Sequence, residues 1–201
     1  MKVIVICFYV VFSYFYVLNY ENTCRNPSID DLGFKDIKIG SSLSEIKNKH
    51  KLSTESTSYF LDSNSCGNFV VFGALSNIIF SGDNKFEEYR ITNSHEYTLF
   101  NSRIGCIKLF FYLDKLVLIE IRNAFGAMEG YARAFGAETC ITTTDRFFNH
   151  KELKVLGNQL SLHVTEYYNN KQIDHTATLI YSHEGINNAL NNIRNQRNND
   201  F

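Results

Sequence analysis

Residues 160–181 read LSLHVTEYYNNKQIDHTATLIY, two β-rich runs on either side of a polar centre. Asn169 and Asn170 are an acceptable pair for a type I′ turn, the usual two-residue connection of a β-hairpin. With these two residues as the turn, Leu162 lies opposite Ala177, so that apolar partners meet on one face. The stretch predicts an antiparallel hairpin, and the rest of the chain is interpreted from it.

A second hairpin is predicted upstream. Residues 107–113 and 116–122 are β-rich runs that close at Asp114-Lys115, where Asp tolerates the positive φ that a type I′ turn requires. Three further segments have strand character: residues 69–72, 78–80 and 86–92.

Helices are expected between the strand-rich regions. Ser42 and Glu45 have the spacing of a capping box and predict a helix over residues 42–51. Residues 124–135 repeat apolar side chains at helical spacing, and Gly136 follows where a left-handed C-terminal cap belongs. In this helix Phe125, Met128, Ala132 and Phe135 are expected to face the core, and a last amphipathic helix is expected over 184–196.

This order of elements predicts an α+β fold, with one or more antiparallel sheets that carry their helices on one face. Two tandem helix-plus-sheet units are a possible division, the first over residues 30–122 and the second, packed on it, over 123–197. There is no Pro- or Gly-rich linker between them.

The N-terminus carries an export pattern. Lys2 is followed by residues 3–18, which hold no charge, and this arrangement is typical of a secretory signal over residues 1–19. Sixteen residues of helix reach about 24 Å, short of the ~30 Å of a bilayer core. The favoured interpretation is a cleaved signal on a secreted or periplasmic protein; an uncleaved membrane anchor over residues 1–18 and a buried core helix are the alternatives.

Of five cysteines, Cys7 lies in the predicted signal and Cys24, Cys66, Cys106 and Cys140 remain. An even number in an oxidising compartment predicts two disulfides, with three possible connectivities. Cys66 and Cys106 each precede a strand-rich run, which favours Cys66–Cys106 and Cys24–Cys140. Buried free thiols are the alternative interpretation.

Charge and motifs exclude several classes of function. Without Lys2 the chain has 19 basic and 21 acidic residues, a net charge of −2, and no basic stripe that nucleic acid would require. There is no phosphate-binding glycine loop, no Gly-x-Ser-x-Gly elbow and no locally spaced histidine pair. The sequence therefore predicts no cofactor, no metal site and no assigned catalytic residue.

Histidines on the 160–181 hairpin offer the best candidate for chemistry. In the predicted register His175 is diagonal to Glu166 on one face, and His163 is diagonal to Asp174 on the other. A carboxylate that orients an imidazole could make it a general base, while the alternative is an ordinary cross-strand polar contact.

Adjacent aromatic residues suggest a binding surface instead. Two neighbouring rings on a strand point to opposite faces, so one ring of Tyr167-Tyr168, and likewise of Phe147-Phe148, is a candidate interface anchor. The predicted binding residues form the hairpin tip: Tyr167, Tyr168, Asn169, Asn170 and Lys171.

The segments IKIGSSLSEI at 37–46 and LDKL at 113–116 resemble the small envelope domain of SmpA/OmlA outer-membrane lipoproteins, and its tandem form in beta-lactamase inhibitory proteins. The resemblance implies an exported, non-enzymatic α+β protein that binds other proteins. The expected function is a protein-binding module of the cell envelope or extracellular space, with another protein there as its partner. A secreted hydrolase with an unrecognised active site is the alternative.

Overall fold

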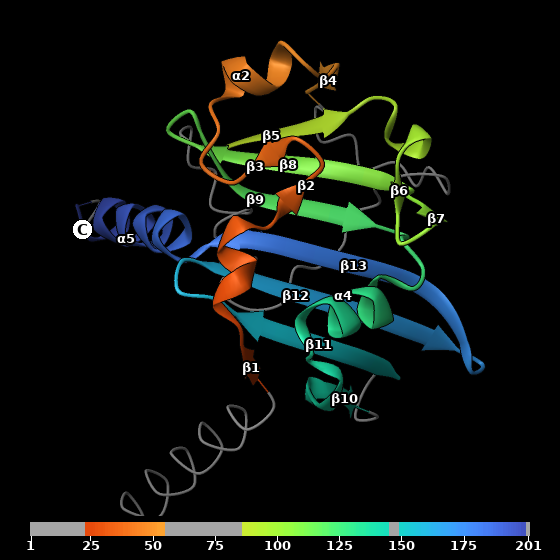
Figure 1. Ribbon diagram of the computed structural model, residues 1–201. Coiled ribbons are helices and arrows are strands. Elements are labelled where there is room, and N and C mark those ends of the chain that lie inside the picture. Colours follow the sequence, from red (N-terminus) through yellow and green to blue (C-terminus); the bar gives the residue numbers. More distant parts are fainter. Residues whose placement is uncertain (1–22, 55–85, 145–148, 200–201) are drawn as a thin grey trace, which may run out of the picture.

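The computed structural model describes residues 23–54, 86–144 and 149–199 (Figure 1). Their main feature is a nine-stranded sheet in the order β1-β11-β12-β13-β9-β8-β5-β4, with β10 also paired to β11. All pairings are antiparallel except that of β1 with β11. The strands are β1 (Thr23–Arg25), β4 (Leu52–Ser53), β5 (Phe86–Ile91), β8 (Cys106–Tyr112), β9 (Lys115–Arg122), β10 (Ile141–Thr144), β11 (His150–Leu156), β12 (Leu160–Asn169) and β13 (Gln172–Ser182).

Smaller elements surround this sheet. Two short hairpins pair β2 (Gly33–Phe34) with β3 (Ile37–Lys38), and β6 (Thr98–Leu99) with β7 (Ser102–Arg103). The described residues contain three α-helices and three 3₁₀ turns: α2 (Leu43–Lys47), α4 (Ala127–Phe135), α5 (His183–Asn199), η1 (Pro27–Asp31), η2 (Ser94–Glu96) and η3 (Glu138–Cys140).

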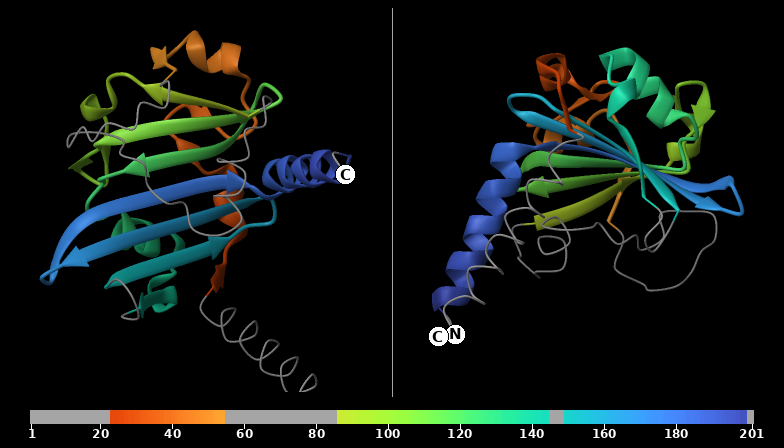
Figure 2. Two further views of the ribbon diagram at one scale, coloured as in Figure 1. Left: turned by 180° about the vertical axis from the view of Figure 1, so that it is seen from behind. Right: turned by 90° about the horizontal axis from the view of Figure 1, so that it is seen from below.

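The expected α+β fold with helices on one face is wrong. Strands dominate the described chain, and α4 and α5 lie on opposite sides of the sheet (Figure 2). The reason is that β8 and β9 are buried on both faces, so that each face needs an apolar cover. On the α5 side, Ile186 and Ala189 pack against Phe110, Leu118 and Leu179. The larger core lies on the α4 side and includes Ile107, Leu109, Ile119, Met128, Val164 and Ile180.

The 160–181 hairpin exists, but its predicted register is wrong. The turn is Asn170-Lys171, with φ of 49° and 67°, and not Asn169-Asn170. Moving the turn by one residue shifts the pairing by two residues. Asp174 then adds a β-bulge between the pairs Tyr168–Ile173 and Tyr167–His175. Leu162 consequently pairs with Ile180 and not with Ala177.

The upstream hairpin has the same construction. Its turn is Leu113-Asp114, with φ of 49° and 63°, one residue earlier than predicted, and Val117 is the bulged residue. Two three-stranded meanders, β5-β8-β9 and β11-β12-β13, meet where β9 pairs with β13. The predicted units 30–122 and 123–197 thus contribute strands to one continuous sheet.

Local helix signals are mostly confirmed. The amide of Glu45 donates to Ser42 Oγ at 3.3 Å, and the amide of Ser42 donates to Glu45 Oε2 at 2.7 Å, although α2 is shorter than the predicted 42–51. Gly136 ends α4 with φ of 60°. Strand 86–92 corresponds to β5, whereas the predicted strands at 69–72 and 78–80 lie outside the described residues.

No helix in the described ranges is long and apolar enough to cross a membrane. Residues 1–18, which carry the predicted signal or anchor, are not among them.

Candidate functional site

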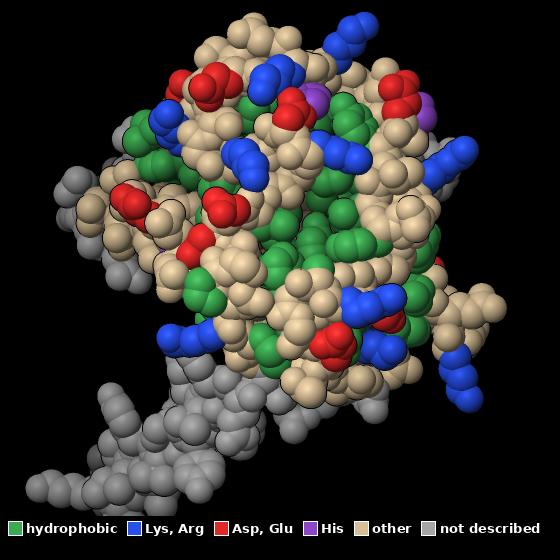
Figure 3. Space-filling view, in the orientation of Figure 1, with side chains coloured by type: hydrophobic (Ala, Val, Ile, Leu, Met, Phe, Trp, Pro, Cys, Tyr) green, Lys and Arg blue, Asp and Glu red, His purple; other side chains and the backbone are tan. Residues whose placement is uncertain are grey.

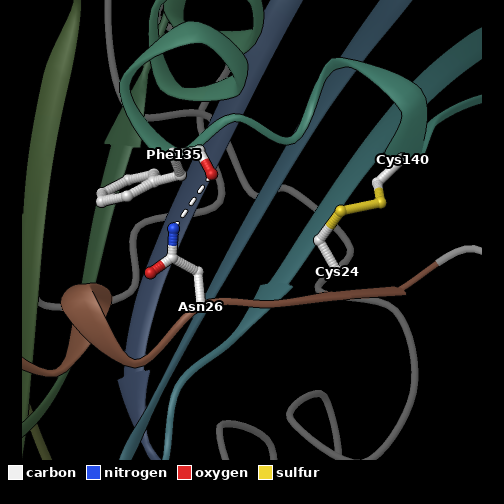
Figure 4. Close-up of a disulfide and its surroundings, with 4 residues drawn as sticks. All are labelled: Cys24, Asn26, Phe135 and Cys140. Atoms are coloured by element: carbon white, nitrogen blue, oxygen red, sulfur yellow. Dashed lines mark hydrogen bonds between the residues drawn. A yellow bond between two sulfur atoms is a disulfide. The ribbon is translucent and has the colours of Figure 1, made fainter.

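A disulfide joins Cys24 on β1 to Cys140 at the end of η3, with 5.9 Å between the Cα atoms (Figure 4). This confirms one of the two predicted pairs. Cys106 is disulfide-bonded as well, and its predicted partner Cys66 lies outside the described residues. Because β1 and β10 both pair with β11, the Cys24–Cys140 bond fastens the outer edge of the sheet.

Residues 23–31 continue from this bond as a strap along the second meander. Asn26 Nδ2 donates to the carbonyl of Phe135 at 2.9 Å, at the end of α4 (Figure 4). Asp30 accepts the amides of Gln159 and Leu160 at 2.8 and 3.0 Å. These hydrogen bonds, led by that of Gln159, lower the pKa of Asp30. The strap therefore has a structural role, since Asn26 and Asp30 both hydrogen-bond to distant parts of the chain.

The hairpin tip that was predicted to bind a partner does not expose Tyr167. Tyr167 is 9% exposed and lies stacked between His150 and His175, with ring centroids 5.6 and 4.4 Å away. Burial raises the pKa of Tyr167 to about 12. A ring held in this way cannot serve as a surface anchor without leaving the sheet.

Tyr168 is half-buried on the other face. Its hydroxyl donates to Glu166 Oε2 at 2.8 Å, and Lys151 Nζ lies 5.3 Å from its ring centroid. The exposed part of the tip is polar and consists of Asn169, Asn170 and Lys171. Residues 147 and 148, the other aromatic pair, fall outside the described ranges.

The predicted histidine–carboxylate pairs do not form. His175 Nδ1 lies 3.0 Å from Asp174, and His163 Nε2 lies 3.4 Å from Glu152. Glu166 pairs in register with Thr176, so its side chain lies on the face opposite that of His175. The error follows from the register, since a shift of one residue moves a side chain to the other face.

Sequence patterns gave no hint of a contact between Ser161 and His183. Ser161 Oγ and His183 Nε2 are 2.6 Å apart, but Ser161 is 2% exposed and therefore shielded from a substrate. Among the described residues no group of His, Cys, Asp or Glu side chains is arranged to hold a metal ion.

An open groove of about 710 Å³ lies beside α4, and we call it the aromatic groove. Phe100 and Phe125 line it and are 41% and 42% exposed, two of the three large apolar side chains in the described residues with such exposure. The lining also includes Gly126, Glu129, Gly130 and Arg133. In the space-filling view, hydrophobic side chains gather on this side of the sheet between charged ones (Figure 3).

The ring of Phe100 packs against α4. It is the first residue of the β6–β7 turn, with φ of 48°, and its ring meets that of Tyr131 edge-on at 4.9 Å. Gly130 permits this contact, because a Cβ there would overlap the Phe100 ring. The Phe100 side of the groove is therefore supported by packing against α4.

The exposure of Phe125 corrects a sequence prediction. The apolar spacing placed Phe125 in the core face of a helix over 124–135, but α4 begins at Ala127 after Gly126, whose φ is 79°. Phe125 precedes the helix and turns outward. The signal that could have indicated this is Gly126, since a glycine there allows the left-handed backbone that starts the helix late.

No family model matches this chain, and neither the curated proteins nor the solved structures compared with it include a match.

Proposed function

We propose that this protein is an exported protein-binding module, and that it binds its partner through the aromatic groove. The observation that carries the proposal is that two exposed phenylalanines, Phe100 and Phe125, line the same groove. Large aromatic side chains with an accessible face are the usual energetic anchors of protein interfaces.

Export is supported by two independent features. The apolar run after Lys2 has the pattern of a secretory signal, and the Cys24–Cys140 disulfide is of the kind that persists in an oxidising compartment. The partner is accordingly proposed to be another protein of the envelope or extracellular space.

The surroundings of the groove define the chemistry of that partner. Glu129 and Arg133 are exposed side chains at its border, so the partner should present an apolar side chain flanked by charges of both signs. An apolar centre with a polar border is the usual composition of such interfaces.

Site-specific photo-crosslinking in the native host tests the proposal. A benzoylphenylalanine at position 125 should yield a crosslinked protein, while the same residue at position 171, on the hairpin tip first predicted to bind, should not. With the captured protein purified, Phe125→Ser should weaken binding at least about tenfold. Unchanged affinity, or crosslinks from position 171 alone, would contradict the groove as the binding site.

A further inference from the structure

We propose that the aromatic groove receives the β8–β9 turn of a second copy of this chain, so that molecules associate head to tail. The inference rests on the proposed function, because it names a second molecule of this chain as the envelope or extracellular protein that the groove binds. The inserted side chain is Leu113, which at 58% exposure is the most exposed of the large apolar side chains in the described residues.

The backbone of Leu113 shows that stability alone does not explain this residue. Leu113 is the first central residue of a type I′ turn, with φ of 49°, where Asn is favoured and a branched apolar residue is strained. The equivalent position of the β12–β13 turn is Asn170, at the same φ of 49°. The chain thus uses the favoured residue at one turn and an exposed leucine at the other.

Phe100 occupies the corresponding position of the β6–β7 turn and has the same left-handed backbone. Its ring gains contacts with Tyr131 and Gly130, which offset the strain. The turn is held by the amide of Leu43, which donates to Asp114 Oδ1 at 3.2 Å, but Leu113 itself is mostly in solvent, so its side chain offsets little of the strain. Strained residues of this kind are concentrated at functional sites.

The charges beside the turn and the groove are complementary. Asp114 and Lys115 follow Leu113 and are exposed. Arg133 and Glu129 border the groove and are exposed as well. A turn that inserts Leu113 beside Phe100 and Phe125 therefore brings one acidic and one basic side chain to a groove bordered by one basic and one acidic side chain.

One molecule cannot fill its own groove. The β6–β7 hairpin precedes the first residue of β8, whereas the β8–β9 turn follows its last residue, and the two lie at opposite ends of that strand (Figure 1). Seven strand residues separate them by about 20 Å. Because the turn and the groove are different surfaces, the contact is heterologous and leaves one free turn and one free groove at the ends of every chain of molecules.

Two variants and their mixture test this arrangement. Leu113→Asn removes the inserted side chain and keeps the groove, while Phe125→Ser removes an apolar part of the groove lining and keeps the turn. In sedimentation velocity on the purified mature protein, the unmodified chain should show concentration-dependent association, which each variant alone should weaken at least about tenfold. The mixture should form a 1:1 dimer that does not grow, because it contains one intact turn–groove pair.

A stability measurement separates loss of association from loss of folding. Leu113→Asn should raise Tm in dilute solution, since Asn accepts the left-handed backbone better than Leu. A more stable variant that no longer associates supports a binding role for Leu113. A monomeric unmodified protein at the highest soluble concentration, variants that still associate, or a mixture without dimers would each overturn the inference.

The two proposals fail in distinguishable ways. If position 125 crosslinks to a different protein while the purified chain stays monomeric, the groove binds a partner and the self-association is wrong. If position 125 crosslinks to nothing, the proposed function is wrong as well.

Discussion

Glu152 on β11 and Glu166 on β12 lie one register position apart, and their carboxylates face opposite sides of the sheet. Glu152 pairs with Thr165, the residue that precedes Glu166. A hydrogen bond from His163 and the charge of Lys154 lower the pKa of Glu152 to about 2, whereas burial raises the pKa of Glu166. The surroundings of these two neighbouring positions thus shift the pKa of a glutamate carboxyl in opposite directions.

Glu166→Gln is expected to stabilise the protein at neutral pH. A carboxyl whose pKa is raised in the folded state favours folding only while protonated, and this contribution is lost as the pH rises through the folded-state pKa. Gln is neutral, and its amide oxygen can still accept the hydrogen bond from the Tyr168 hydroxyl. Tm measured at pH 7 and pH 4 should therefore show a gain at pH 7 that shrinks at pH 4, and a loss at pH 7 would contradict the prediction.

Glu152→Gln is the matched substitution on the other face of the sheet, and it is expected to lower the free energy of unfolding. Because the pKa falls from 4.5 to about 2, the ionised carboxylate contributes roughly 2–3 kcal/mol above pH 4.5, a figure that includes a reduction for its 25% exposed side chain. This contribution is lost as the pH falls from 4.5 toward 2. Urea unfolding at pH 6 and pH 3 should show the difference between the two proteins narrowing at pH 3.

The disulfides give a prediction that covers both cysteine pairs. Alkylation of the native protein without reductant should label none of Cys24, Cys66, Cys106 and Cys140, and a non-reduced digest should contain Cys66–Cys106 as one linked peptide. Cys24→Ser with Cys140→Ser should lower the free energy of unfolding by about 2–5 kcal/mol, since the bond closes a loop with a sequence separation of 116. A linked Cys66–Cys140 peptide would contradict both pairings.

Lys171→Gly should stabilise the β12–β13 hairpin. Lys171 has φ of 67° in the turn, where a non-glycine residue carries a cost that glycine avoids. The expected gain is about 0.5–1 kcal/mol after the entropy that glycine adds to the unfolded chain. Gln172→Gly is the control, because Gln172 belongs to β13 and glycine weakens a strand. A similar change in both variants would exclude the turn as the cause.

The sequence by itself determined the features that depend on neighbouring residues. The Ser42–Glu45 capping box, the Gly136 cap and the existence of both hairpins follow from interactions within a few residues, and each is present. The Cys24–Cys140 pair was also predicted, from cysteine number and position. Interactions between neighbouring residues determine the caps and the hairpins. For the disulfide, four cysteines allow only three connectivities.

The tertiary structure alone decided the register, the placement of α5 and the exposure of single side chains. Both turns lie one residue away from their predicted positions, and the bulges at Asp174 and Val117 change which side chains share a face beyond them. Tyr167 became buried because two histidines from neighbouring strands enclose it, and Phe125 became exposed because Gly126 delays α4. The burial of Tyr167 depends on contacts between residues far apart in the chain, which a local pattern of apolar and polar residues does not record.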